Sequence, residues 1–258
     1  MAAFGSQKIG AVERFIYGLR EDSPLVIPQV DPDAFSEDEV SKLLIFLERE
    51  GIRFIAIGGT LVDPVHLNML IALAVKDHGM SLVTYPSESA ALVDGIRDKT
   101  AIYWIRISNA TNPYFLTDFS VMNSLFIKKR QMEPLPTDYV FDDRGSIGTA
   151  AWLARAWPVP RDKPQIALAL AKAAEYSGSR FFVLAGGSGA SLPPSNEMVR
   201  LIRKETGLFL IPTSGIRSCD VAKELFEAGA DGIHVSKLLE SKDNWPVLSK
   251  MIRAARNY

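Results

Sequence analysis

Length, composition and charge exclude several classes of protein. The chain has 258 residues, of which 47% are hydrophobic and 23% charged. A large buried core is therefore expected and disorder is not. The 29 basic and 30 acidic residues leave a formal net charge of −1, which argues against a nucleic-acid partner.

The N-terminal stretch and the cysteine content predict a cytoplasmic protein. Residues 1–21 lack the apolar core of a signal peptide, and the apolar run 67–75 is too short to span a bilayer. The single cysteine, Cys219, cannot form an intramolecular disulfide and suits a reducing compartment.

Eight short apolar runs along the chain predict β-strands. Each run is apolar throughout rather than alternating, which is typical of buried parallel strands. The predicted strands are residues 25–30, 53–59, 81–86, 101–107, 138–141, 180–187, 208–215 and 231–236.

Amphipathic helical patterns lie between most of these runs, for example at 36–50, 163–178 and 218–230. Eight strand–helix units favour a (β/α)8 TIM barrel, and we take residues 1–258 as one domain. The fifth unit is irregular, because residues 131–163 do not have the pattern of one helix.

In such a barrel the active site lies at the carboxyl ends of the strands, and phosphate usually binds at the later ones. Stretches rich in glycine, serine and threonine lie at the carboxyl ends of the sixth and seventh predicted strands, and a serine–lysine pair lies at the end of the eighth. One such loop could be a plain turn, but three at matching strand ends favour an anion site. The candidates are Gly186, Gly187, Ser188 and Gly189, then Thr213, Ser214 and Gly215, then Ser236 and Lys237.

Acidic residues follow the first predicted strand. Asp31 and Asp33 stand just beyond it, and Thr60 ends the second strand. A carboxylate at a strand end can hold Mg²⁺, with Thr60 as a further ligand. The alternative is that residues 31–33 form a turn that caps the next helix.

Aromatic residues lie in and beyond the fourth predicted strand. Tyr103 is within it, and Tyr114, Phe115 and Phe119 follow. They predict either an apolar groove for a lipid tail or ordinary core packing. The three histidines have no zinc-ligand spacing.

Several motifs together resemble a known family, the geranylgeranylglyceryl and heptaprenylglyceryl phosphate synthases. The likeness covers about residues 22–255. It rests on DPD at 31–33, IGGT at 57–60, YPSESAAL at 85–92, SNATNPYFL at 108–116, the stretch 158–190, SGIRS at 214–218 and AGADGIHVS at 228–236. The resemblance implies a TIM-barrel prenyltransferase that moves a prenyl group from its diphosphate to sn-glycerol 1-phosphate with Mg²⁺. It also implies a homo-oligomer that touches membranes only transiently, through its lipid substrate or product.

The resemblance assigns roles position by position. Asp31 and Thr60 match magnesium positions, and Asp31 is the residue on which catalysis would depend. Residues 183–189 match the loop that binds the acceptor phosphate. Thr213 and Ser214 match glycines of the seventh-strand loop, and Ser236 and Lys237 match the eighth-strand pair. The four aromatic residues would line the prenyl groove.

Departures from the family pattern leave the acceptor open. Ala185 stands where the family has a glutamate that grips a glycerol hydroxyl, and Val183 replaces a tyrosine. Thr213, Ser214 and Ser236 replace glycines. A changed acceptor is one consequence; ionisation of the diphosphate without an acceptor, and a non-catalytic phosphate-binding barrel, are two others. A sugar-phosphate isomerase that uses Asp31 and Asp142 stays as a weaker alternative.

Overall fold

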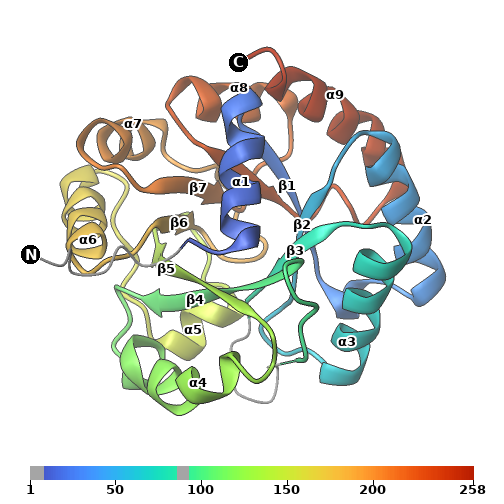
Figure 1. Ribbon diagram of the computed structural model, residues 1–258. Helices are drawn as coiled ribbons and strands as arrows, with labels where there is room; N and C mark the ends of the chain where they lie inside the picture. Colours follow the sequence, from blue (N-terminus) through green and yellow to red (C-terminus); the bar gives the residue numbers. More distant parts are fainter. Residues whose placement is uncertain (1–8, 86–92) are drawn as a thin grey trace, which may run out of the picture.

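The computed structural model describes residues 9–85 and 93–258 and shows a closed barrel of parallel strands (Figure 1). Each strand pairs with its neighbours in sequence, and β8 closes the barrel on β1, with Leu25 opposite Gly232 and Pro28 opposite Val235. The strands are β1 Leu25–Val30, β2 Phe54–Ile57, β3 Ser81–Thr84, β4 Thr100–Ile107, β5 Glu133–Phe141, β6 Phe181–Ala185, β7 Phe209–Thr213 and β8 Gly232–Val235. All eight predicted strands are confirmed, although β5 begins five residues earlier than expected.

The helices surround this barrel and cover its outer face (Figure 1). Leu43 of α2, Met198 of α7 and Leu248 of α9 are buried in the cluster between helices and strands. The helices are α1 Ala11–Asp22, α2 Glu37–Arg49, α3 Pro64–Ala72, α4 Phe119–Ile127, α5 Thr149–Ala154, α6 Pro164–Tyr176, α7 Asn196–Glu205, α8 Cys219–Glu227 and α9 Trp245–Ala255. Short 3-10 or π turns occupy Pro32–Ala34 (η1), Leu73–Asp77 (η2), Tyr114–Asp118 (η4) and Lys242–Asn244 (η5). Residues 86–92 of the YPSESAAL motif lie outside the described residues.

The fifth unit is irregular, as the sequence predicts. Its helix α5 has only six residues and ends at Arg155, whose φ is +48°. The chain then runs extended, and Val159 bridges to Asp142 beside β5. The Asn109 amide fixes this path, because its Nδ2 donates to the carbonyls of Phe141 and Trp157, both at 2.8 Å.

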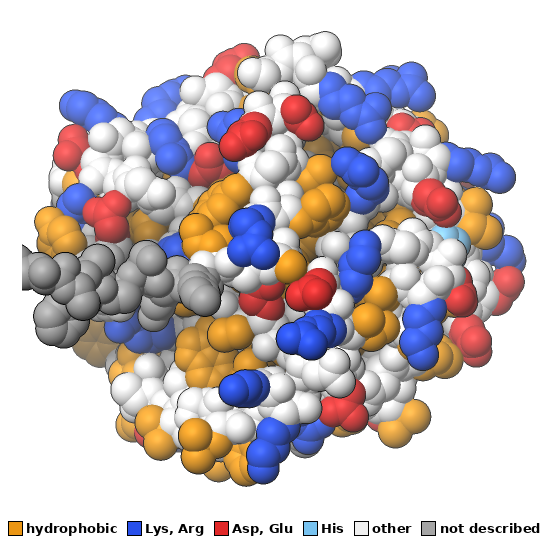
Figure 2. All heavy atoms as spheres, viewed as in Figure 1, with side chains coloured by type: hydrophobic (Ala, Val, Ile, Leu, Met, Phe, Trp, Pro, Cys, Tyr) orange, Lys and Arg blue, Asp and Glu red, His pale blue; other side chains and the backbone are white. Residues whose placement is uncertain are grey.

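Helix α1 closes the barrel at the amino ends of the strands, across the front in Figure 1. Val12 and Ile16 are fully buried there against the barrel interior. Glu13, also buried, accepts hydrogen bonds from Arg180 at 2.5 and 2.7 Å. Figure 2 shows acidic and basic side chains interspersed over this face. A ligand of the barrel interior must therefore enter from the opposite, carboxyl end.

Among residues 9–85 and 93–258, no helix combines the length and apolar character needed to cross a membrane.

Candidate active site

A cavity of about 480 Å³ opens at the carboxyl ends of the strands. It is lined from β1 and its loop, from the β2 loop and from the loops after β6, β7 and β8. The predicted residues that line it are Asp31, Thr60, Phe115, Phe119, Gly187, Ser188, Thr213, Ser214, Ser236 and Lys237. Residues far apart in the sequence are thus brought to one opening, as the barrel topology requires.

Asp31 lies at the mouth of this cavity and is half-buried. Its Oδ1 accepts a hydrogen bond from the Asp33 backbone N–H at 3.1 Å, so the carboxylate also caps the turn η1. A Cβ on Gly59 would lie 3.0 Å from the same Oδ1, so the glycine of the β2 loop lets the carboxylate approach. Burial, followed by the nearby Asp33 and Glu240 carboxylates, raises the pKa of Asp31.

The donor set at this point fits a magnesium ion that is bound together with phosphate. Among residues 9–85 and 93–258, no group of three or more His, Cys, Asp or Glu side chains is arranged to hold a metal ion. Mg²⁺ commonly uses one or two carboxylates and takes its other ligands from water and substrate phosphate. Since burial, and after it the Asp33 and Glu240 carboxylates, raise the pKa of Asp31, a cation beside it would favour the ionised carboxylate. Asp31 and Thr60 would hold the ion.

A smaller cavity of about 20 Å³ adjoins the first. Its walls come from three loops, at Gly187–Ala190, Ser214–Arg217 and residues 234–237. Gly187, Gly189 and Gly215 have φ near +80, +80 and +70°, a backbone region that glycine adopts freely. Backbone and hydroxyl donors from three loops therefore surround a space that suits one small anionic group.

The cations at this smaller cavity come from two loops. Lys237 is paired with Glu240, its Nζ donating to both carboxylate oxygens at 2.9 Å. Arg217, which the sequence reasoning missed, also lines the cavity, and its Nη2 donates to the Ala190 carbonyl at 3.1 Å. A signal existed in the SGIRS motif, because Arg217 stands two residues after Gly215 of the seventh-strand loop. An incoming anion would compete with Glu240 for Lys237.

The structure brings two of the four aromatic residues predicted for the groove to the large cavity. Phe115 and Phe119 line the large cavity together with Ile105, Ile107 and Leu61. Tyr103 instead lies in the barrel core, because its side chain points inward from the middle of β4, and its hydroxyl contacts His234 Nε2 at 3.1 Å. Tyr114 packs against Phe119 and the cluster beneath α4 and does not line the cavity.

Ala185 is fully buried and its side chain faces the barrel interior, in the cluster that holds Val183 and Phe141. The position that carries a glutamate in the resembling family is therefore part of the apolar barrel core here, and Ala185 lines neither cavity. Tyr139 of β5, which is opposite Val183 in the sheet, lines the cavity. Burial raises the pKa of Tyr139 to about 12, so its hydroxyl stays protonated near neutral pH.

Asp142 is not available as an acid or base. It is fully buried and accepts from Arg144 Nε at 3.0 and 2.9 Å and from Nη2 at 2.6 Å. The isomerase alternative needs a free carboxyl at this strand end, so the structure contradicts it. Gly186 also departs from expectation: it lines neither cavity, and its α-carbon packs against the Arg144 side chain.

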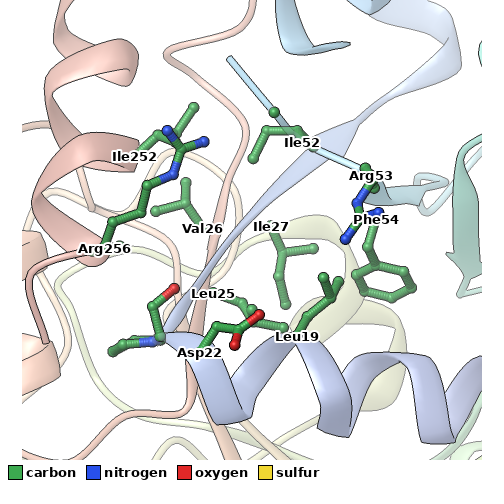
Figure 3. Close-up of a pocket in the computed structure, with 14 residues that line it drawn as sticks. Leu19, Asp22, Leu25, Val26, Ile27, Ile52, Arg53, Phe54, Ile252 and Arg256 are labelled. Atoms are coloured by element: carbon green, nitrogen blue, oxygen red, sulfur yellow. The ribbon is translucent and has the colours of Figure 1, made fainter. Parts of the chain in front are cut away.

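Another cavity, of about 380 Å³, lies at the opposite end of the barrel (Figure 3). It sits among α1, the amino ends of β1 and β2, and α9, with Asp22, Arg53 and Arg256 at its edge. Barrel enzymes bind their substrates at the carboxyl ends of the strands, so this cavity is not the candidate active site.

Comparison with known proteins agrees with the fold. The PcrB family matches residues 19–256 of the chain. A geranylgeranylglyceryl phosphate synthase from Pyrococcus horikoshii is 31% identical over 254 residues, which cover 98% of each chain. A protein of the same name from Korarchaeum cryptofilum is 33% identical over 222 residues, covering 86% of this chain and 89% of the relative.

A solved structure gives the same fold. The (S)-3-O-geranylgeranylglyceryl phosphate synthase of Thermoplasma acidophilum, crystallised with its substrate sn-glycerol-1-phosphate, superposes with a TM-score of 0.87. The two chains are 24% identical, and the match covers 97% of this chain and 100% of the other. The protein is thus a barrel enzyme of the prenyltransferase class that forms ether bonds. It belongs to the PcrB family.

Proposed function

We propose that this protein transfers a polyprenyl group from its diphosphate to the hydroxyl of a glycerol-phosphate-like acceptor, with Mg²⁺. The observation that carries this proposal is the opening that joins the half-buried Asp31, the small anion cavity and the apolar wall at Phe115 and Phe119. Relatives with more than 30% identity are synthases of geranylgeranylglyceryl phosphate, which agrees with this combination.

Each part of the opening suits one part of the substrates. Asp31 and Thr60 would hold the metal that accompanies the prenyl diphosphate. The prenyl tail would run along Phe115 and Phe119. The acceptor phosphate would occupy the small cavity, where loop N–H groups, the Ser188 and Ser236 hydroxyls and the two cations can bind it.

The reaction breaks the allylic carbon–oxygen bond, and its electron pair leaves with the diphosphate. The acceptor hydroxyl oxygen then bonds to the allylic carbon and loses its proton. When bound, Mg²⁺ supplies charge stabilisation for the leaving group. Because Tyr139 has a pKa of about 12, it can hydrogen-bond the acceptor but is not a base at neutral pH. We therefore assign the proton to an oxygen of the departing diphosphate.

A second function has one specific observation in its favour. Ala185 is an apolar residue of the barrel core and offers no carboxylate to a glycerol hydroxyl, and a lost hydrogen bond of this kind costs about 1–3 kcal/mol. Loss of the acceptor altogether would leave an enzyme that ionises a prenyl diphosphate and makes a hydrocarbon or a prenyl alcohol.

We also propose that the protein self-associates. Helix α4 exposes Val121, Met122, Leu125 and Phe126, each more than half exposed, and Figure 2 shows hydrophobic side chains along its lower edge, over α4. An apolar face of this kind usually marks an interaction site, and a second copy of the chain is the occupant we infer. We place the enzyme in the cytoplasm, where Cys219 stays a free thiol. Contact with a membrane would be limited to exchange of lipid substrate and product.

Product analysis tests the proposed function. The protein is incubated with geranyl, farnesyl or geranylgeranyl diphosphate and Mg²⁺, with and without sn-glycerol 1-phosphate, and the products are identified by mass. We expect product only when the acceptor is present. Turnover without acceptor would support the second function instead, and binding without turnover would contradict both.

A further inference from the structure

Arg144 is the largest side chain that is fully buried in the described chain, and it lies directly behind the anion cavity. It follows β5, two residues beyond Asp142, with which it forms a fully buried ion pair. Taking two charges out of water costs several kcal/mol per ion. A buried ion pair of this kind is therefore expected to have a function, and the prenyl-transfer chemistry makes no use of it.

Every N–H group of the Arg144 guanidinium has an acceptor within the protein. Nε donates to Asp142, and Nη2 donates to Asp142 and to the Leu184 carbonyl at 3.2 Å. Nη1 donates to the carbonyls of Thr213 at 2.5 Å and Ser214 at 2.9 Å. Because a guanidinium has five N–H donors, none is left for a ligand. Arg144 therefore does not bind an anion itself.

The carbonyls that Arg144 binds belong to two neighbouring strands and to a loop, and both strands lead into loops that line the anion cavity. Leu184 lies in β6, just before the loop that supplies Gly187 and Ser188, and Ser214 begins the β7 loop. The Ser191 hydroxyl also donates a hydrogen bond to the Arg144 carbonyl at 2.9 Å. One side chain thus fixes the β6 and β7 loops relative to each other.

Ser214 shows why such support is needed. Its φ is +71°, a left-handed conformation that is unfavourable for a residue with a side chain. The family that the sequence resembles has glycine here, which adopts this conformation without strain. In this chain Arg144 binds the carbonyl of the strained residue itself. Gly186 makes room for it, since a Cβ there would lie 2.3 Å from Arg144 Cδ.

We propose that Arg144 is a positioning residue. It holds the β6 and β7 loops in the arrangement that binds the acceptor phosphate. In doing so it takes the place of the glycine that the resembling family has at position 214 of the β7 loop. This inference rests on the proposed function, because it assigns the small cavity to the acceptor phosphate. Arg144 acts through the carbonyls of Thr213, Ser214 and Leu184. It sets the affinity for the acceptor rather than for the prenyl diphosphate at Asp31.

The test compares variants by acceptor binding and by steady-state kinetics. Asp142→Asn/Arg144→Met removes both charges, so that neither is left buried alone, and Arg144→Lys keeps one charge but loses the planar fork. We expect KM for sn-glycerol 1-phosphate to rise at least tenfold in the double variant and less in Arg144→Lys. KM for the prenyl diphosphate should change less than threefold in both.

A rescue experiment separates positioning from general destabilisation. Adding Ser214→Gly to Arg144→Lys should recover at least half of the lost acceptor affinity, measured by calorimetric titration with sn-glycerol 1-phosphate, because glycine holds the loop conformation unaided. The control is Glu13→Gln/Arg180→Met, which removes a partly buried ion pair at the other end of the barrel. It should lower the melting temperature without a selective effect on acceptor KM.

The outcomes are distinguishable from failure of the proposed function. If the unaltered protein neither binds nor prenylates sn-glycerol 1-phosphate, the proposed function is wrong, and the role of Arg144 is wrong with it. If the unaltered protein is active and a folded Arg144→Lys variant keeps its acceptor KM, only the role of Arg144 is overturned. Equal loss for both substrates, without rescue by Ser214→Gly, would also overturn it.

Discussion

At the scale of single residues, the Lys237–Glu240 pair controls the positive charge that faces the candidate active site. Lys237 donates to both oxygens of Glu240, and its side chain is about half exposed. Exposed pairs contribute little to stability, but this one holds an ammonium away from an incoming phosphate. Its effect should therefore be seen in ligand binding and not in folding.

Glu240→Gln tests this competition. The substitution frees Lys237 and removes a negative charge near Asp31, so pyrophosphate with Mg²⁺ should bind about three- to tenfold more tightly at low salt. Added salt should shrink the gain, because exposed charges are screened. Calorimetric titration at two ionic strengths measures it. Unchanged affinity, or weaker binding, would show that Lys237 does not face the ligand.

His234 predicts a second residue-scale effect, on stability. Burial lowers its pKa to about 3 from the usual 6.5. The unfolded chain therefore takes up a proton below pH 6.5 while the folded chain does not. The buried, neutral histidine therefore contributes to the free energy of unfolding. This contribution is fully present above pH 6.5 and is lost as the pH falls toward 3.

Urea unfolding at pH 7 and pH 5 checks the sign of that effect. Between pH 6.5 and 5 the unaltered protein should lose about 2 kcal/mol more unfolding free energy than His234→Gln. Ile233→Val, a neighbouring buried change without a titratable group, serves as the control and should keep the slope of the unaltered protein. Equal slopes for His234→Gln and the unaltered protein would contradict the buried, neutral histidine.

At the scale of elements, the glycines of the β6 loop have different tasks, although they stand almost side by side. Gly186 has no room for a Cβ because Arg144 lies 2.3 Å from that position. Gly189 has open space but a φ of +80°. Within GGSG, Gly186 is therefore required by a packing contact and Gly189 by its backbone conformation. Only the backbone conformation of Gly189 serves the anion cavity directly.

Alanine substitution separates these tasks. Gly186→Ala should cost about 1–3 kcal/mol of unfolding free energy through overpacking and should disturb acceptor binding. Gly189→Ala should cost about 1–2 kcal/mol through backbone strain alone. Gly18→Ala, in the interior of α1 with open space around it, should instead stabilise by about 0.5–1 kcal/mol. Thermal and urea unfolding measure all three, and a neutral Gly186→Ala would refute the close contact.

Helix α4 is the second element with a testable property. Its face at Val121, Met122, Leu125 and Phe126 is apolar and exposed. Leu125→Lys should shift the protein to a smaller assembly in light scattering while its melting profile stays that of a folded barrel. Ser124→Lys, on the adjacent exposed position, is the control. A mass that already corresponds to one chain in the unaltered protein would contradict self-association.

At the scale of the whole molecule, the sequence predicted the barrel well, because buried parallel strands are recognisable as apolar runs. Residues that follow those runs directly, such as Asp31 and Ser236, could be assigned to one end of the barrel for the same reason. Tyr103 could not, since one strand position decides whether an aromatic side chain enters the core or the cavity. The predicted assembly and metal stay predictions.

The Arg144 network had no sequence signal. Asp142, Asp143 and Arg144 have the composition of an exposed turn, and charged residues are rarely fully buried. Only the closed barrel brings the carbonyls of Leu184, Thr213 and Ser214 around one guanidinium. Local patterns could predict which loops meet at the active site, but contacts over 40 to 70 residues decide how those loops are held.

The most direct test of the proposed reaction follows the oxygen atom of the acceptor hydroxyl. The protein is given geranylgeranyl diphosphate, Mg²⁺ and sn-glycerol 1-phosphate labelled with oxygen-18 at its terminal hydroxyl, and the products are examined by mass spectrometry. We expect a prenyl ether that retains the label, with one diphosphate released for each ether formed. A prenyl alcohol or hydrocarbon without the label, formed equally well when the acceptor is left out, would contradict the proposed reaction.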